Sequence, residues 1–209
     1  SGVESAILAF SSYYDGGSYE GDDEVATVEY SLDGGSTWTL LQTLEGSEGT
    51  WDFEVIDLDV VLGEAEVHLG FRYNDGGGWL YGWAIDDVTV LEPSGLDLAL
   101  IGLDSEGVVL APATEDLAGT VVNLGTDTVY SYTVTWSMEG ASGETTIDGL
   151  TLGTAESHSF SFNEVLPFDW SGNYNVTAEI TAVNGGSDDQ ALNNAQSVSV
   201  TAIYFGVYS

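Results

Sequence analysis

An acidic, glycine-rich loop is the segment whose residue types are best suited to binding a ligand. It reads Asp-Gly-Gly-Ser-Tyr-Glu-Gly-Asp-Asp-Glu and runs from Asp15 to Glu24. Ca²⁺ is a hard cation that takes about six to eight oxygen ligands from carboxylates, carbonyls and water. We therefore expect a calcium site here, with Asp15, Asp22, Asp23 and Glu24 as candidate ligands. The alternative is a solvated acidic loop, since the spacing does not fit the EF-hand pattern.

Other residues capable of chemistry are few. Arg72 is the only permanent cation, and we expect it to pair with neighbouring carboxylates on the outward face of its strand. His68 and His158 fall in different predicted domains, so they do not form one metal site or catalytic pair. The sequence has no Gly-x-Ser-x-Gly elbow, no His-Glu-x-x-His motif and no phosphate-binding glycine loop. We therefore predict that the protein is not an enzyme.

Two aromatic residues follow a glycine loop. Trp79 and Tyr81 stand directly after Gly76-Gly77-Gly78. Rings exposed in such a loop can stack on a sugar, which makes a glycan a candidate partner. The simpler interpretation, which we favour, is that both rings fold back onto the core.

The charge balance excludes several kinds of partner. The chain has 35 Asp and Glu residues, one basic residue and a formal net charge of −34. Nucleic-acid binding needs Lys and Arg to neutralise phosphates, so we exclude it. Attraction to anionic membranes is disfavoured for the same reason, and no apolar run is long enough to insert into a bilayer. Cations are the partners that this charge favours, in a salt-rich or divalent-rich exterior. The alternative is that the charge only keeps an exported protein soluble.

Period-two alternation of apolar residues indicates strands from one end of the chain to the other. An acidic disordered tail would lack this pattern and the 11% aromatic content. We predict an all-β protein with strands near residues 6–10, 26–32, 38–40, 51–56, 67–73, 83–91, 96–100, 117–121, 130–138, 160–162, 174–182 and from 197 onward.

The best linker is Glu92-Pro93-Ser94-Gly95, because Pro cannot join a central ladder and Gly is conformationally free. It separates a first domain, residues 1–92, from a second, residues 96–202. Regularly spaced short strands predict an immunoglobulin-like β-sandwich for the second domain. The chain begins Ser-Gly without Met, which indicates a processed form or an excerpt of a longer protein.

The C-terminal segment, residues 203–209, is unusual. It reads Ile-Tyr-Phe-Gly-Val-Tyr-Ser and is apolar or aromatic on both faces. A two-sided apolar strand should be buried against something. We therefore predict an assembly role for Ile203, Tyr204, Phe205, Val207 and Tyr208.

The first domain resembles the bacterial MAM-like jelly rolls, including the choice-of-anchor J and cleaved-adhesin types. Three segments carry the resemblance, and they read Tyr-Ser-Leu-Asp-Gly-Gly-Ser-Thr-Trp at 30–38, Ile-Asp-Leu at 56–58, and Phe-Arg-Tyr at 71–73 leading to Trp-Ala-Ile-Asp-Asp-Val at 83–88. The resemblance implies a non-catalytic, jelly-roll-like β-sandwich of a secreted protein. It also implies that a cation ties the acidic loop to Asp86-Asp87, of which at most one faces a given site.

The second domain resembles the bacterial cell-adhesion-related, CARDB-like immunoglobulin modules. The matching residues are Asp-Leu-Ala-Leu at 97–100, Gly-Thr-Val-Val-Asn-Leu-Gly at 119–125, and the segment from Asp188 to Asn194. Together the resemblances imply an extracellular or cell-surface adhesion protein.

The strand count suggests how such a protein could assemble. We predict six strands in the first domain, whereas a jelly roll has about eight. Either the missing strands were removed or another chain supplies them. The apolar C-terminal strand of a second copy is a candidate donor, and such head-to-tail exchange builds a homo-oligomer or filament. Our prediction is therefore a structural or adhesive extracellular protein. The alternative is an accessory, carbohydrate-binding module of a larger secreted hydrolase.

Overall fold

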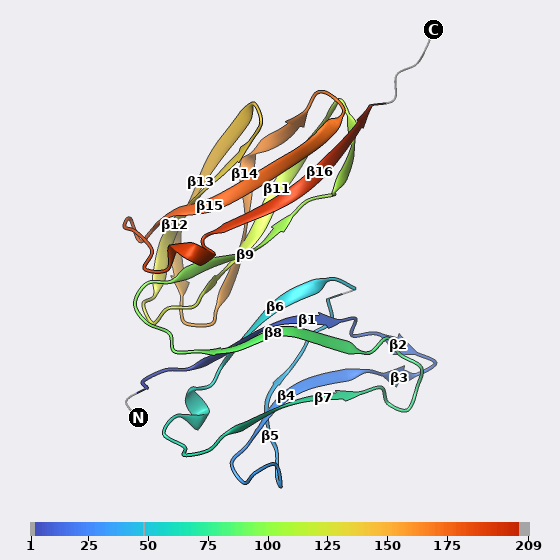
Figure 1. The fold of residues 1–209 in the computed structure, drawn as a ribbon, viewed down its shortest axis with the longest axis vertical. Helices are drawn as coiled ribbons and strands as arrows, with labels where there is room; N and C mark the ends of the chain where they lie inside the picture. The colour runs from blue at the N-terminus through green and yellow to red at the C-terminus, as the bar shows by residue number, and fades with distance from the viewer. Residues whose placement is uncertain (1–2, 48, 205–209) are drawn as a thin grey trace. The chain divides into compact units, whose positions relative to one another are not determined.

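The computed structural model describes residues 3–47 and 49–204. It divides the chain into two compact units, Ser1–Glu92 (unit 1) and Pro93–Ser209 (unit 2), and both are built from β-strands (Figure 1). The all-β prediction is confirmed. Among the described residues, no helix has the length and apolar character to cross a membrane.

Unit 1 contains two three-stranded antiparallel sheets with the orders β6-β1-β8 and β5-β4-β7, together with a two-stranded ribbon, β2-β3. Its elements are β1 (Ile7–Tyr14), β2 (Ser18–Tyr19), β3 (Asp22–Asp23), β4 (Val25–Ser31), β5 (Thr39–Thr43), β6 (Trp51–Asp57), the 3-10 turn η1 (Asp59–Val61), β7 (His68–Asn74) and β8 (Trp83–Leu91).

The core of unit 1 lies between its two sheets. Period-two alternation directs Leu8 and Phe10 of β1 toward Val28 of β4, and all three are fully buried. Phe10 meets Phe71 of β7 edge to face, with ring centroids 5.2 Å apart. Burial of these apolar side chains supplies most of the stabilisation that unit 1 gains on folding.

The six predicted strands of unit 1 appear as β1, β4, β5, β6, β7 and β8, and the ribbon β2-β3 was missed. The described residues place six of the eight strands of unit 1 in two three-stranded sheets and two in a short ribbon, and the resemblance to a jelly roll is not confirmed.

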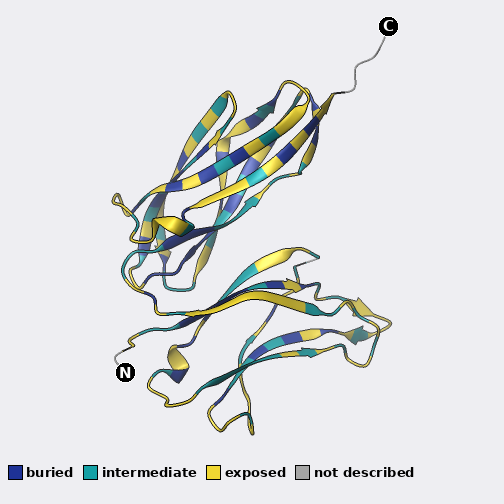
Figure 2. Cartoon of the chain, in the orientation of Figure 1, coloured by how far each residue is buried: buried dark blue, intermediate teal, exposed yellow. Residues whose placement is uncertain are grey.

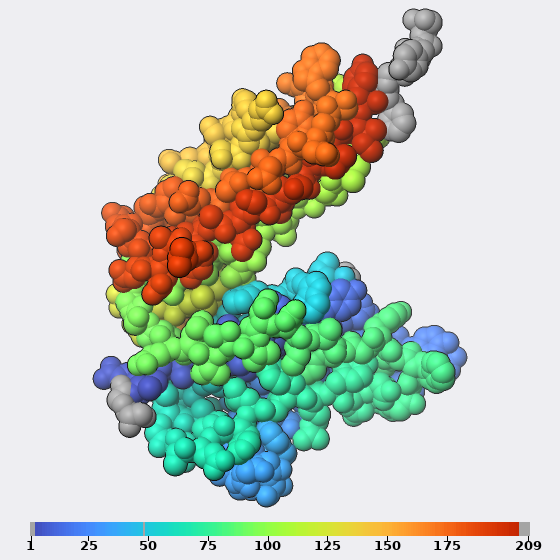
Figure 3. All heavy atoms as spheres, in the orientation of Figure 1, coloured from blue at the N-terminus to red at the C-terminus, as the bar shows by residue number. Residues whose placement is uncertain are grey.

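Strand β8 is open to solvent on both faces. It forms one edge of its sheet among the described residues, and Figure 2 shows it exposed along most of its length; its atoms lie at the surface that faces the viewer in Figure 3. Val90 lies opposite the fully buried Leu8 and so points toward the interior, yet it is 57% exposed. Ile85 and Val88, on the same side, are also exposed. We call Ile85, Val88 and Val90 the β8 face.

Unit 2 is a sandwich of a three-stranded sheet, β14-β11-β9, and a five-stranded sheet, β10-β16-β15-β12-β13. Its elements are β9 (Leu98–Asp104), β10 (Val108–Ala111), β11 (Ala113–Asn123), β12 (Val129–Met138), β13 (Ala141–Leu152), β14 (Ser157–Phe168), β15 (Gly172–Val183), the 3-10 turn η2 (Ala191–Asn193) and β16 (Ala195–Tyr204).

The core of unit 2 is larger and more completely buried than that of unit 1. Tyr132 of β12 is almost fully buried and meets Phe160 of β14 edge to face. Its hydroxyl forms a 2.8 Å hydrogen bond with His158 Nδ1. The polar atom of the buried Tyr132 ring therefore has a hydrogen-bond partner in an otherwise apolar core. His158 is therefore a half-buried structural residue.

The C-terminal extension begins inside a strand. Ile203 and Tyr204 are the last two residues of β16 and pair in parallel with Leu110 and Ala111 of β10. The structure therefore joins residues 203 and 204 to the sandwich rather than to a separate extension. The other predicted assembly residues, Phe205, Val207 and Tyr208, lie outside the described residues.

Candidate functional site

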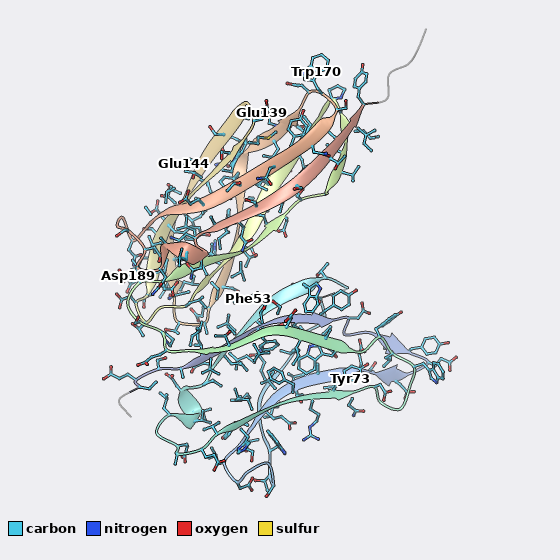
Figure 4. All side chains as sticks on the ribbon, in the orientation of Figure 1. Phe53, Tyr73, Glu139, Glu144, Trp170 and Asp189 are labelled. Carbon is cyan, nitrogen blue, oxygen red and sulfur yellow. The ribbon has the colours of Figure 1, made fainter. Side chains whose placement is uncertain are left out.

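Glu24 holds the acidic loop of unit 1 together. Its carboxylate accepts the Gly17 N–H at 2.9 Å through Oε1 and the Tyr73 hydroxyl at 2.6 Å through Oε2. Only 5% of Glu24 is exposed. The Tyr73 hydroxyl in turn accepts the Gly82 N–H at 3.1 Å, which ties down the loop between β7 and β8 (Tyr73 is labelled in Figure 4). Burial and the Glu24 hydrogen bond raise the pKa of Tyr73 to about 12.

The other predicted calcium ligands are dispersed. Asp22 and Asp23 form the short strand β3, where Asp22 lies against Gly78. Asp86 is on β8 opposite Ser11, and its carboxylate accepts the N–H of Asp87, a bulge residue with φ of 53°. Asp15 begins the loop.

No group of three or more His, Asp or Glu side chains in the described ranges is placed to hold a metal ion. The structure thus uses Glu24 as a buried hydrogen-bond acceptor and does not gather the six predicted ligands. Calcium binding by this loop stays a prediction.

Arg72 forms an ion pair on the outer face of the β5-β4-β7 sheet, as predicted. Its Nε and one terminal nitrogen donate to the Glu29 carboxylate of β4 at 2.8 to 3.0 Å. This fork is the strong geometry for a guanidinium and a carboxylate. The Arg72 hydrogen bonds lower the pKa of Glu29, so the pair's stabilisation is present at neutral pH and is lost as the pH falls through that lowered value.

The aromatic residues of the loop between β7 and β8 are exposed. Trp79 is 93% exposed and Tyr81 is 78% exposed. The expectation that both rings fold back onto the core is wrong. The run of glycines before them provides no side chains against which a ring could pack, and Tyr81 has Gly17 beside it.

An apolar patch lies at the C-terminal end of unit 2. Leu110 of β10 and Ile203 of β16 are cross-strand partners that point outward, with 61% and 40% of their surface exposed. Val108, two residues before Leu110 and on the same face, extends the patch, whereas Tyr204 is exposed on the other face, opposite Ala111. We call Val108, Leu110 and Ile203 the terminal patch. Trp170, labelled in Figure 4, projects from the β14–β15 turn at the same end and is 74% exposed.

Strand β10, which supplies Val108 and Leu110 to this patch, was not predicted from the sequence. The signal was Val-Val-Leu-Ala at 108–111, a short apolar run after Gly107. The patch also adjoins the longest acid-free stretch of the chain. No Asp or Glu occurs from Gln190 to Ser209, although 35 acidic residues are spread through the rest. The β16 side of the patch is therefore free of acids nearby in sequence, whereas Val108 and Leu110 of β10 lie beside the acids of residues 104–116.

Many of the remaining carboxylates organise loops. Asp33 accepts the N–H and the hydroxyl of Thr37 at 2.8 and 2.7 Å, and the Ser31 hydroxyl at 2.8 Å. These hydrogen bonds lower the pKa of Asp33 to about 2. In unit 2, Asp188 and Asp189 accept the N–H groups of Leu98 and Leu96. These acids stabilise turns and loops through hydrogen bonds, in a chain that has no cysteine for disulfide bonds.

No known family profile matches the chain, and no curated protein matches it. Similar solved structures include the CARDB domain of a Pyrococcus furiosus protein in complex with di-metal ions. It is 21% identical, and the match covers 53% of this chain and 96% of that domain with a TM-score of 0.44. A domain of a Methanosarcina acetivorans protein described as a cell surface protein is 21% identical. The match covers 52% of this chain and 92% of that domain, with a TM-score of 0.39.

The glycoside hydrolase domain of Endo-D from Streptococcus pneumoniae matches 94% of this chain and 29% of its own length, at 13% identity and a TM-score of 0.30. The chain is thus similar to CARDB domains over about half of its length.

Proposed function

We propose that this chain is a non-catalytic extracellular structural or adhesive protein whose copies associate through the C-terminal strand. The observation that carries the proposal is the uncovered apolar β8 face on unit 1, in a chain whose C-terminal segment, residues 203–209, is apolar or aromatic at most positions. Solvent-exposed apolar clusters of this kind are typical of interaction surfaces.

The geometry of β8 supports strand addition as the mode of contact. Its free edge carries unpaired backbone groups, and its inward-pointing valines lack a covering layer among the described residues. An added strand would satisfy both, with backbone hydrogen bonds along the edge and alternate side chains on the β8 face. The bulge at Asp87 interrupts the edge, which leaves Val88 to Leu91 as the regular stretch for pairing.

Charge sets the conditions for assembly. A net charge of −34 opposes contact between copies at low ionic strength. The acid-free C-terminal stretch lowers this repulsion locally, and salt screens the rest, since the Debye length is about 3 Å at 1 M. Association should therefore strengthen with salt, as expected for an apolar contact between like-charged bodies.

Light scattering after size exclusion tests the proposal on the full chain and on a chain that ends at Tyr204. The truncation leaves β16 intact. We expect the full chain to form oligomers or fibres in 1 M salt (about a 3 Å screening length), and the truncated chain to remain monomeric. A monomeric full chain at every salt concentration would contradict the proposal.

A matched pair of substitutions distinguishes a specific contact between copies from nonspecific aggregation. Val90→Ser removes an exposed apolar side chain from the β8 face, and Leu192→Ser removes a fully exposed one from unit 2. Val90→Ser should abolish association and Leu192→Ser should leave it unchanged. Equal effects of the two would point to nonspecific aggregation.

A glycan-binding accessory module is the second candidate function. The exposure of Trp79 and Tyr81 favours it, since two rings free of the core can stack on sugar faces. Affinity electrophoresis in gels containing soluble polysaccharides tests it: retardation lost in Trp79→Ala and kept in Trp170→Ala would support this function. Identical mobility of the wild-type chain with and without every polysaccharide would exclude it for the sugars used.

A further inference from the structure

A cavity of about 770 Å³ lies in unit 2 where the chain crosses from β9 to β10. Four carboxylate side chains line it, those of Asp104, Glu106, Glu115 and Asp116. It belongs to unit 2 rather than to the acidic loop of unit 1, and Val108 and Leu110 of the terminal patch also line it. None of its acids was singled out from the sequence.

The crossover explains why the cavity exists. Strand β9 pairs with β11 as far as Asp104, opposite Ala118, and the chain then leaves that sheet. After Gly107, which has a φ of 72°, it enters β10 and pairs with β16 in the other sheet. Strand β11 continues past the point where β9 ends, so its first residues have no neighbour on that side among the described residues.

Glu115 occupies this uncovered part of β11 and points inward. It stands two residues before Leu117, which is fully buried, and is itself only 9% exposed. Its Oε1 accepts the N–H of Glu106 and so fixes the crossover loop. Its Oε2 is buried and has no hydrogen-bond partner in the described part of the chain. An unpartnered buried carboxylate oxygen is costly, because it loses its hydration without replacement.

The neighbouring acids increase the free-energy cost of burying the Glu115 carboxylate. Asp104, Glu106 and Asp116 are exposed at the rim of the cavity, and all three add negative charge. The chain's only Arg is in unit 1, and it has no Lys, so no permanent side-chain cation of unit 2 can neutralise Glu115. A cation from solution is the group that satisfies Oε2 and reduces the repulsion among the four acids.

We infer that the cavity at the β9–β10 crossover is a Ca²⁺ site with Glu115 as its buried ligand. The polar side-chain atoms named around it are all oxygens, the ligand type of a hard cation. No three carboxylates converge there in the described structure. The ion is therefore held by Glu115, one rim carboxylate, backbone carbonyls and water, which is a common composition for Ca²⁺.

Isothermal titration of the EDTA-treated full chain with CaCl₂ tests this site. We expect saturable binding that weakens at least tenfold in Glu115→Gln, which keeps the shape of the side chain and removes its charge. Glu144→Gln, on the exposed surface of β13, and Asp22→Asn, in the acidic loop of unit 1, should bind as the wild type does. Weakening by Asp22→Asn rather than by Glu115→Gln would move the calcium site to unit 1 and overturn the inference.

A substitution at the rim of the cavity tests the site without changing a buried residue, in case Glu115→Gln fails to fold. Asp104→Asn alters an exposed side chain, so the sandwich should remain intact, and we expect several-fold weaker binding with an unchanged circular dichroism spectrum. Absence of saturable binding to the wild type would also overturn the inference. In that case a proton or water, rather than Ca²⁺, accompanies Glu115.

Discussion

The Tyr73 hydroxyl donates a 2.6 Å hydrogen bond to Glu24 Oε2, joining two residues 49 positions apart in the sequence. Glu24 is among the most buried carboxylates of the described residues. The bond links the acidic loop to β7, and through Gly82 it reaches the start of β8. This contact holds together the loops at that end of unit 1.

Tyr73→Phe should therefore destabilise unit 1. The change removes the hydroxyl and leaves Glu24 Oε2 buried without its partner, which costs about 1–3 kcal/mol. Urea unfolding followed by tryptophan fluorescence measures the change. Tyr81→Phe is the matched control, because the Tyr81 ring is largely exposed. Equal stabilities of Tyr73→Phe and the wild type would show that the bond contributes nothing.

Gly70 of β7 provides the space in which the Trp38 ring packs. A Cβ added at Gly70 would lie 2.5 Å from Trp38 Cζ3, well inside van der Waals contact. Gly70→Ala should displace the ring and cost about 1–3 kcal/mol, the usual range for overpacking. Gly102→Ala meets nothing within 4 Å and is the control. In a double-mutant cycle, Trp38→Ala should remove most of the Gly70→Ala penalty, and additive losses would contradict the contact.

Glu54 makes unit 1 less stable as the pH rises. Burial raises its pKa, and the nearby Asp52 and Glu45 raise it further. Since the folded pKa is above the unfolded one, the folded state binds the proton more tightly. The resulting stabilisation is complete below the unfolded pKa of about 4.3 and is lost as the pH rises through the folded value.

Glu54→Gln should consequently stabilise unit 1 at pH 7, and its advantage over the wild type should shrink toward pH 4. Melting temperatures between these two pH values measure the difference. Glu64→Gln, at an exposed position, should track the wild type throughout. A constant offset between Glu54→Gln and the wild type across the range would refute the assignment.

Alternation of apolar residues was enough to predict the all-β class and most of the strands, because the core residues of a sandwich repeat with period two. Leu8, Phe10 and Val28 are fully buried as that pattern requires. Strands β10 and β13 were not predicted from the sequence. In β13 (Ala141–Leu152) small and polar residues outnumber apolar ones, so the sheet is completed by backbone pairing with β12 rather than by a visible apolar stripe.

The candidate sites were harder to predict, because the role of a carboxylate depends on neighbours that are distant in sequence. Glu24 was grouped with other acids as a calcium ligand, and the hydrogen bond that it accepts from Tyr73 on another strand was not anticipated. Glu115 was overlooked among 35 acids, although it is in phase with Leu117 and Val121, both fully buried. An acid in phase with the apolar face of a strand is the signal that distinguishes a buried carboxylate from a solvated one.

Disulfide trapping between two single-cysteine variants tests the assembly proposal most directly, because the chain has no native cysteine. Val90→Cys places a thiol on the β8 face, and Val207→Cys places one in the C-terminal segment. When the two are mixed in high salt and oxidised, we predict a Val90–Val207 cross-linked dimer in excess of either homodimer. Leu192→Cys in place of Val90→Cys should give no such excess. Equal yields with Cys at position 90 and at position 192 would contradict association through the C-terminal strand.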